Sequence, residues 1–94
     1  MTKVFKIVWT DQALDNLEEI VAYIEVFNPS AATRLGQRLI DLAESLCEFP
    51  DRGKPSHNGT REMSNIWPYL IRYRVNERHV EILHVRHGAR LQDE

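Results

Sequence analysis

The sequence predicts an α+β domain in which two helices cover one face of a sheet. Residues 4–9 alternate as a strand does, and residues 11–49 carry apolar side chains at helical spacing. Residues 69–75 and 80–85 return to the period of two that is typical of strands, and residues 60–63 can enter a short strand. We therefore expect an N-terminal strand, a helical hairpin and then a three-stranded antiparallel segment. At 94 residues, the chain is a single domain over residues 1–94.

The first strand and the first helix follow one another directly. Phe5, Ile7 and Trp9 share one face of the expected strand. Thr10 then has the side chain of an N-cap, and Asp11 lies in the first turn, where the helix dipole favours a carboxylate. The apolar stripe of this amphipathic helix recurs every three or four residues, at Ala13, Leu17, Ile20, Ile24 and Phe27.

A second amphipathic helix begins after a short break. Asn28 is a favoured N-cap residue, and Pro29 is tolerated at the first helical position because no backbone N–H is needed there. We expect this helix to end near Phe49-Pro50 and to pack antiparallel to the first. Its apolar stripe comprises Ala32, Leu35, Leu39, Leu42 and Leu46.

The remaining strands follow a loop-rich segment, residues 51–65, in which Asn58-Gly59 indicates a turn and residues 60–63 can enter a short strand. Residues 69–75 and 80–85 are expected to form an antiparallel hairpin around the polar turn 76–79. Strict alternation would place Tyr69, Ile71, Tyr73 and Val75 on one face, and in the next strand Val80, Ile82 and His84.

Charge distribution, hydropathy and cysteine content limit the kinds of partner and the cellular location that we expect for this protein. The net charge of −2 divides into an acidic half, residues 1–51 with four Lys/Arg against nine Asp/Glu, and a basic half, residues 52–94 with eight against five. The basic half suits an acidic partner, either nucleic acid or protein. There is no apolar run long enough to span a membrane and no signal-peptide pattern. Cys47 is the single cysteine, so a reducing cytoplasm is the simplest location.

No cofactor or metal site is predicted. The four glycines are scattered rather than gathered in a phosphate-binding loop, and the four histidines lack metal-ligand spacing. Cys47 is read as a small buried hydrophobe. Arginines with aromatic neighbours remain, and they suit nucleic acid, an acidic protein segment or simply a solvated sheet face. These residues are Arg61, Arg72, Arg74, Arg86 and Arg90, with Tyr69, Tyr73 and His87.

Several short sequence segments, taken with their order along the chain, resemble the RelE/ParE superfamily of bacterial toxins from type II toxin–antitoxin modules. They include Asn28-Pro29-Ser30-Ala31-Ala32, Thr60-Arg61-Glu62 and Pro68-Tyr69-Leu70-Ile71, and together with the others they span residues 9–88. The resemblance implies a helical hairpin on an antiparallel sheet. It also implies neutralisation by a cognate antitoxin, and a role in plasmid stabilisation.

The superfamily contains two activities. RelE-like members cleave mRNA in the ribosome, whereas ParE-like members inhibit DNA gyrase by binding. Compared with the nucleases, this chain has Ser56 in place of a Glu, Leu70 in place of an Arg and Gly88 in place of an aromatic residue. A nuclease needs a base and cations around the phosphate. The resemblance therefore favours a gyrase inhibitor over an enzyme, with an endoribonuclease or an inactive structural member as alternatives.

The resemblance also implies three sets of site residues. For target binding they are Arg74, Arg86, His87 and Arg90. For an alternative nuclease they are His87 as acid/base, with Arg61 or Arg90 at the phosphate. For antitoxin binding they are Leu17, Val21, Ile24 and Tyr73.

Overall fold

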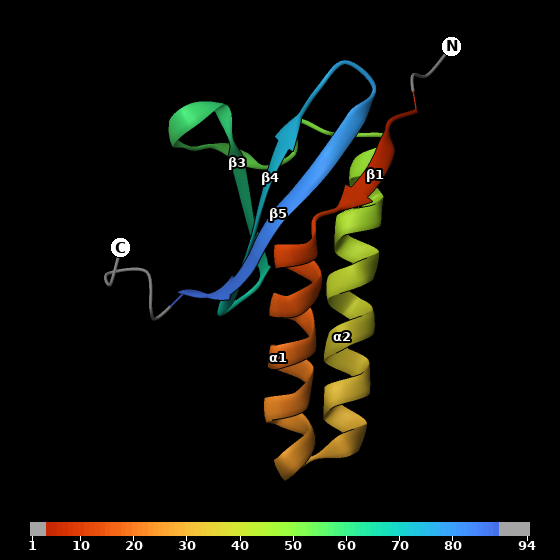
Figure 1. The fold of residues 1–94 in the computed structure, drawn as a ribbon, viewed down its shortest axis with the longest axis vertical. Coiled ribbons are helices and arrows are strands. Elements are labelled where there is room, and N and C mark those ends of the chain that lie inside the picture. Colours follow the sequence, from red (N-terminus) through yellow and green to blue (C-terminus); the bar gives the residue numbers. More distant parts are fainter. Residues whose placement is uncertain (1–3, 89–94) are drawn as a thin grey trace.

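Two long helices pack against a five-stranded mixed sheet in the computed structural model, which describes residues 4–88 (Figure 1). The elements in chain order are β1 (Lys6–Trp9), α1 (Asp11–Phe27), α2 (Pro29–Glu44), β2 (Lys54–Pro55), β3 (Arg61–Ile66), β4 (Tyr69–Val75) and β5 (His79–His87). Short 3-10 turns lie at Ser45–Cys47 and His57–Gly59. The predicted α+β architecture with a helical hairpin is confirmed.

The sheet has the strand order β1-β5-β4-β3-β2, and its β1–β5 pair is parallel while the other pairs are antiparallel. The predicted three-stranded antiparallel segment is confirmed as β3, β4 and β5, and the parallel pairing of β1 with β5, on which no prediction was made, makes the sheet mixed. No short turn connects β1 to β5, so their relative direction depends on how the chain leaves β1 toward α1. Strand β2 was not predicted, because two residues show no period.

Side-chain caps start both helices where the sequence indicated. The Thr10 hydroxyl accepts a hydrogen bond from the Ala13 N–H at 3.1 Å, and the Asn28 side-chain oxygen accepts one from the Ala31 N–H at 3.0 Å. Thr10 also donates its hydroxyl to the Ile82 carbonyl at 2.9 Å. This residue therefore ties the start of α1 to β5. Helix α2 ends at Glu44 and continues as the 3-10 turn, slightly before the expected end.

The two helices run antiparallel and approach each other closely at a glycine. A Cβ atom added to Gly36 would lie 3.1 Å from the Cγ2 atom of Val21. Figure 1 shows the hairpin extending well beyond the end of the sheet. Three large apolar side chains near the end of α1 are exposed as a result: Tyr23 at 65%, Phe27 at 72% and Val26 at 79%.

The core lies between the helix pair and the sheet. Leu39 of α2 and three strand residues, Ile71, Tyr73 and Ile82, have no exposed surface. Apolar side chains from β1 and α1 pack around this cluster. Within residues 4–88, neither helix combines the length and apolar character that crossing a bilayer requires.

A β-bulge in β5 changes which side chains reach the core. Arg72 pairs with His84, but the next residue, Tyr73, pairs with Ile82, so Leu83 is an extra residue in β5. The bulge turns Val85 into the core, where it is 1% exposed, and moves His84 to the opposite face. The prediction that His84 shares a face with Val80 and Ile82 is therefore wrong, because strict alternation fails at a bulge.

Candidate functional site

The face of the sheet opposite the helices is rich in arginine. Leu70 pairs with Arg86, Arg72 with His84 and Arg74 with Glu81, and cross-strand partners project to the same side. Tyr73 and Ile71, which alternate with these β4 residues, face the helices and are fully buried. We define the basic face as Arg72, Arg74, His84 and Arg86.

The members of the basic face differ in how firmly they are held. Arg72 forms an ion pair with Glu62 of β3, with a separation of 2.5 Å. Their side chains are 14% and 24% exposed, so this pair is part of the sheet surface. Arg74, by contrast, is exposed at the end of β4. Arg74 and Arg86 lie about 13 Å apart along the strand direction, because four residues of β4 separate their pairing positions.

His87 does not lie with the predicted target-binding arginines. It pairs with Tyr69 on the helix-facing side of the sheet, and the two rings make an edge-to-face contact with centroids 5.3 Å apart. Arg74 and Arg86 project from the opposite side. The structure therefore divides the predicted set, and its fourth member, Arg90, lies outside the described residues.

Arg61 already has backbone partners. Its guanidinium donates hydrogen bonds to the Gly53 carbonyl at 2.7 Å and the Asp51 carbonyl at 3.3 Å. Arg61 lies in β3 and pairs with Tyr73 of β4, whereas His87 lies in β5, on the other edge of β4, and pairs with Tyr69. Four residues along β4 and two strand spacings separate Arg61 from His87 by about 16 Å. The structure does not bring these two predicted nuclease residues together.

Tyr73 is unavailable to a partner on the surface. Its side chain is 0% exposed, and its hydroxyl donates to the Pro50 carbonyl at 2.7 Å and accepts from the Gly53 N–H at 2.8 Å. Burial raises the pKa of the Tyr73 phenol above its ordinary value of 10.0. Its predicted role in antitoxin binding is wrong for this conformation, because it secures the loop around residues 50–53 from inside.

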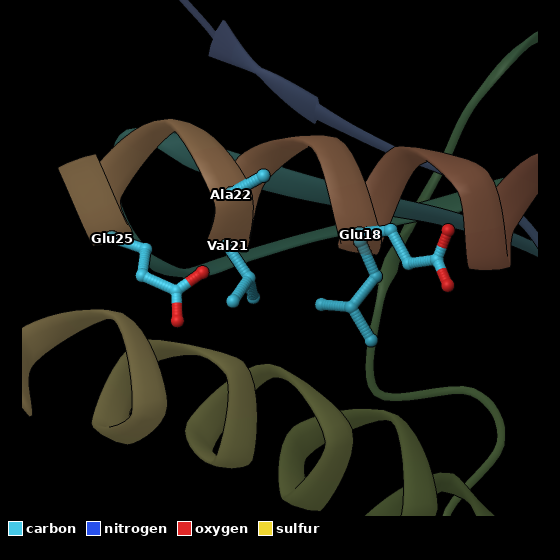
Figure 2. A pocket seen from close by; sticks show the side chains of 5 residues that line it. Glu18, Val21, Ala22 and Glu25 are labelled. Carbon is cyan, nitrogen blue, oxygen red and sulfur yellow. The ribbon is translucent and has the colours of Figure 1, made fainter. Parts of the chain in front are cut away.

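A second candidate surface is a groove along α1, with a volume of about 450 Å³. Figure 2 shows the side chains of Val21 and Glu25 pointing toward α2, with Glu18 two turns earlier in the same helix. Ile24, predicted with Leu17 and Val21 to bind the antitoxin, is half-buried and does not line the groove. We define the α1 groove by its lining residues, Leu17, Glu18, Val21, Ala22 and Glu25.

Sequence reasoning named Arg72 among the candidate arginines but left it out of the predicted target-binding set, and it placed His84 on the wrong face. Arg72 lies between Arg74 and Arg86 on one face, and its alternation with Ile71 and Tyr73 was a usable signal. His84 joins the same face only because of the bulge, for which the sequence offered no sign. Glu18 and Glu25, which line the α1 groove, were not among the predicted site residues. Among residues 4–88, no group of three potential ligands could hold a metal ion.

The basic face and the α1 groove are open surfaces on a small α+β domain, and both suit macromolecules better than small ligands. A family model described as "ParE toxin of type II toxin-antitoxin system, parDE" matches residues 7–92. The chain belongs to this family of toxins, and the predicted superfamily is confirmed.

Individual relatives agree with this assignment. Toxin RelE2 of Caulobacter vibrioides is 44% identical over 86 residues, which cover 92% of this chain and 98% of that protein. A solved structure of the chromosomal ParDE system from P. aeruginosa matches with a TM-score of 0.81 and 24% identity, covering 89% of this chain and 96% of that one. The toxin–antitoxin complex RelBE2 from Mycobacterium tuberculosis matches with a TM-score of 0.66 and 24% identity, covering 93% and 94%. At such identities the two structures support the fold.

Proposed function

We propose that this toxin acts in the cytoplasm by binding and inhibiting DNA gyrase, and that a cognate antitoxin holds it inactive. The observation that carries the choice of target is the separation of Arg61 from His87. Cleavage of RNA requires an acid or base and a cation around one phosphate. The backbones of Arg61 and His87 lie about 16 Å apart, given strand and residue spacings, and Arg61 already donates to two backbone carbonyls, so this pair is not arranged around one phosphate. Inhibition by binding requires no such convergence.

The basic face is the proposed surface for the target. Arg74 and Arg86 lie on one side of the sheet, so an acidic partner could meet both cations at once, whereas Arg72 between them is paired with Glu62. Guanidinium groups bind carboxylates and phosphates in bidentate geometry. The face therefore suits either an acidic protein surface or the DNA that a gyrase complex contains.

An antitoxin partner is proposed from the relatives. The two solved neighbours are described as a ParDE system and a RelBE2 toxin–antitoxin complex. On this chain, Leu17 and Val21 are members of the predicted antitoxin-binding set that line the α1 groove. We propose that the antitoxin covers this groove.

The second candidate function is ribosome-dependent cleavage of mRNA. It is favoured by the 44% identity to a relative named Toxin RelE2. In that case His87 would act as acid or base, and Arg61 or Arg90 would bind the phosphate. Arg61 would first have to release the carbonyls of Gly53 and Asp51. We therefore rank this function second.

Two assays on the purified chain distinguish these functions. One measures supercoiling by purified gyrase, and the other measures protein synthesis in a cell-free translation reaction. Blocked supercoiling with intact translation would support gyrase as the target. Blocked translation with mRNA cleavage and intact supercoiling would contradict the proposal and support the nuclease. No effect in either assay would indicate an inactive structural member.

A further inference from the structure

We propose that the basic face binds an extended protein segment in which a basic residue lies between two acidic ones, and that carboxylates within the face exclude nucleic acid. This inference rests on the proposed function, because it states which component of a gyrase–DNA complex the toxin would contact. It depends on the pattern of charges across the sheet, which is not uniformly positive.

Two carboxylates interrupt the basic face. Glu81 of β5 pairs with Arg74 of β4, and Glu62 of β3 pairs with Arg72 of β4. Because cross-strand partners project to the same side, both glutamates lie on the side of the sheet opposite the helices. Lys54 of β2 pairs with Glu62 and continues the alternation to the edge of the sheet. At each of these three pairings a cation therefore lies beside a carboxylate.

The net charge on this side of β2 to β5 is small. Four cations against two carboxylates leave a formal charge of +2, from Lys54, Arg72, Arg74 and Arg86 against Glu62 and Glu81. Affinity for nucleic acid grows with the number of phosphates that Lys and Arg neutralise. A polyanion lying across this face would also meet two like charges, which is unfavourable. The face is therefore poorly suited to DNA or RNA.

Arg72, at the centre of the face, is largely withheld from a phosphate. Its Nη2 atom forms the ion pair with Glu62, and its side chain is 14% exposed. The Nε atom of the same guanidinium is buried and has no hydrogen bond partner within residues 4–88. Bidentate binding of a phosphate requires two guanidinium N–H groups together. With one nitrogen engaged by Glu62 and another shielded from solvent, Arg72 is not presented for that geometry.

A protein segment of mixed charge matches this pattern. Arg74 and Arg86 lie about 13 Å apart along the strand direction, and the row that contains Arg72 and Glu62 crosses midway between them. In an extended segment, residues four positions apart are separated by about the same distance and project to the same side. Acidic residues at those positions would meet Arg74 and Arg86. A basic residue midway, on a long flexible stem such as that of Lys, would reach toward Glu62.

Two peptides that differ in one residue test the preference for mixed charge. The first contains Glu-Thr-Lys-Thr-Glu and the second Glu-Thr-Glu-Thr-Glu, in otherwise identical capped sequences. Each is titrated into the full chain, and binding is followed by NMR through the backbone amide shifts. We expect the Lys peptide to bind about fivefold more tightly, since an exposed ion pair contributes modestly, with shifts mainly in β4 and β5. Equal affinities, or shifts confined to the helices, would overturn the inference.

Removal of the two carboxylates tests the exclusion of nucleic acid. Glu62→Gln combined with Glu81→Gln should bind a short duplex DNA about tenfold more tightly than the parent chain and should lose the preference for the Lys peptide. Glu44→Gln with Glu48→Gln, the same charge change at exposed positions outside the sheet, should behave as the parent does. Fluorescence anisotropy measures DNA binding, and circular dichroism checks folding. Equal DNA affinities of the two double variants would overturn the exclusion.

The supercoiling assay distinguishes failure of this inference from failure of the proposed target. Selectivity for the Lys peptide without inhibition of gyrase would contradict gyrase as the target and would still support the charge pattern of the basic face. Inhibition of gyrase without that selectivity would support the target and overturn the inference.

Discussion

The side-chain oxygen of Asn16 accepts a hydrogen bond from the backbone N–H of Val85 at 3.1 Å, joining residues 69 positions apart in the chain. Val85 lies just after the bulge at Leu83, where the regular pairing of β5 with β4 is interrupted. A bulge leaves backbone groups without ladder partners, and a buried N–H without a partner is costly. A polar residue on the sheet side of α1 thus completes the hydrogen bonding of the sheet.

Replacing Asn16 by Ala should therefore destabilise the fold. Loss of one buried hydrogen bond partner costs about 1–3 kcal/mol. The higher helix propensity of Ala works in the opposite direction, so the measured loss is a lower bound. Urea denaturation measures the change, with Gln12→Ala at an exposed position of α1 as the control. Hydrogen exchange of the Val85 amide should also accelerate. Unchanged stability together with unchanged exchange would show that water replaces Asn16 without loss.

Removing the Tyr73 hydroxyl should destabilise the protein at neutral pH. Tyr73→Phe leaves the Gly53 N–H and the Pro50 carbonyl without their buried partner. We expect a loss of about 1–3 kcal/mol in the free energy of unfolding. Denaturation of both proteins at the same neutral pH provides the measurement. A variant as stable as the parent would mean that the loop at 50–53 is held by other contacts.

The same residue predicts a dependence of stability on alkaline pH. Because burial raises the pKa of folded Tyr73 above its ordinary value of 10.0, the unfolded chain loses this proton first as the pH rises. The stabilising contribution is complete below about pH 10 and is lost as the pH rises through the pKa of the folded state. The parent protein should therefore lose more stability than Tyr73→Phe between neutral pH and about pH 11. Equal losses of stability in the parent and in Tyr73→Phe over this pH range would argue against a raised pKa of Tyr73.

Two glycines should respond differently to the same substitution. A Cβ atom at Gly53 would lie 2.7 Å from the Tyr73 hydroxyl and 2.8 Å from the Glu62 carbonyl, so Gly53→Ala should cost about 1–3 kcal/mol through overpacking. At Gly36 the close contact is a single methyl of Val21 at 3.1 Å, which a shift of a few tenths of an ångström would relieve, and helix propensity favours Ala. Gly36→Ala should therefore change stability by less than about 1 kcal/mol. Thermal denaturation of the two variants measures both losses. A greater loss of stability in Gly36→Ala than in Gly53→Ala would contradict this account of the packing.

Charge reversal on the basic face tests the proposed target surface. Arg74→Glu combined with Arg86→Glu should raise the concentration needed to inhibit gyrase by at least about tenfold, because like charges would face an acidic partner. Arg38→Glu together with Arg34→Glu, the same charge change on α2, serves as the control. Circular dichroism confirms folding. If both double variants inhibit supercoiling equally, the target surface lies elsewhere on the toxin.

The sequence predicted the elements that depend on local chemistry. Thr10 and Asn28 cap their helices as expected, because a side-chain oxygen at the cap satisfies a backbone N–H only three residues away. Strands β3 and β4 were also identified, since alternation of apolar and polar residues is a local pattern. The burial of Tyr73 was not foreseen, as its two hydrogen bond partners lie in a loop 20 or more residues earlier.

The sequence by itself determined the class of fold, the helical hairpin and the membership of a toxin superfamily, because periodicity, capping and ordered motifs are written in neighbouring residues. Only the tertiary structure decided the parallel pairing of β1 with β5, the bulge at Leu83 and hence the faces of His84 and Val85. It likewise separated His87 from Arg74 and Arg86 and gave Arg61 its backbone partners. These features depend on contacts between residues far apart in the chain, which no local pattern encodes.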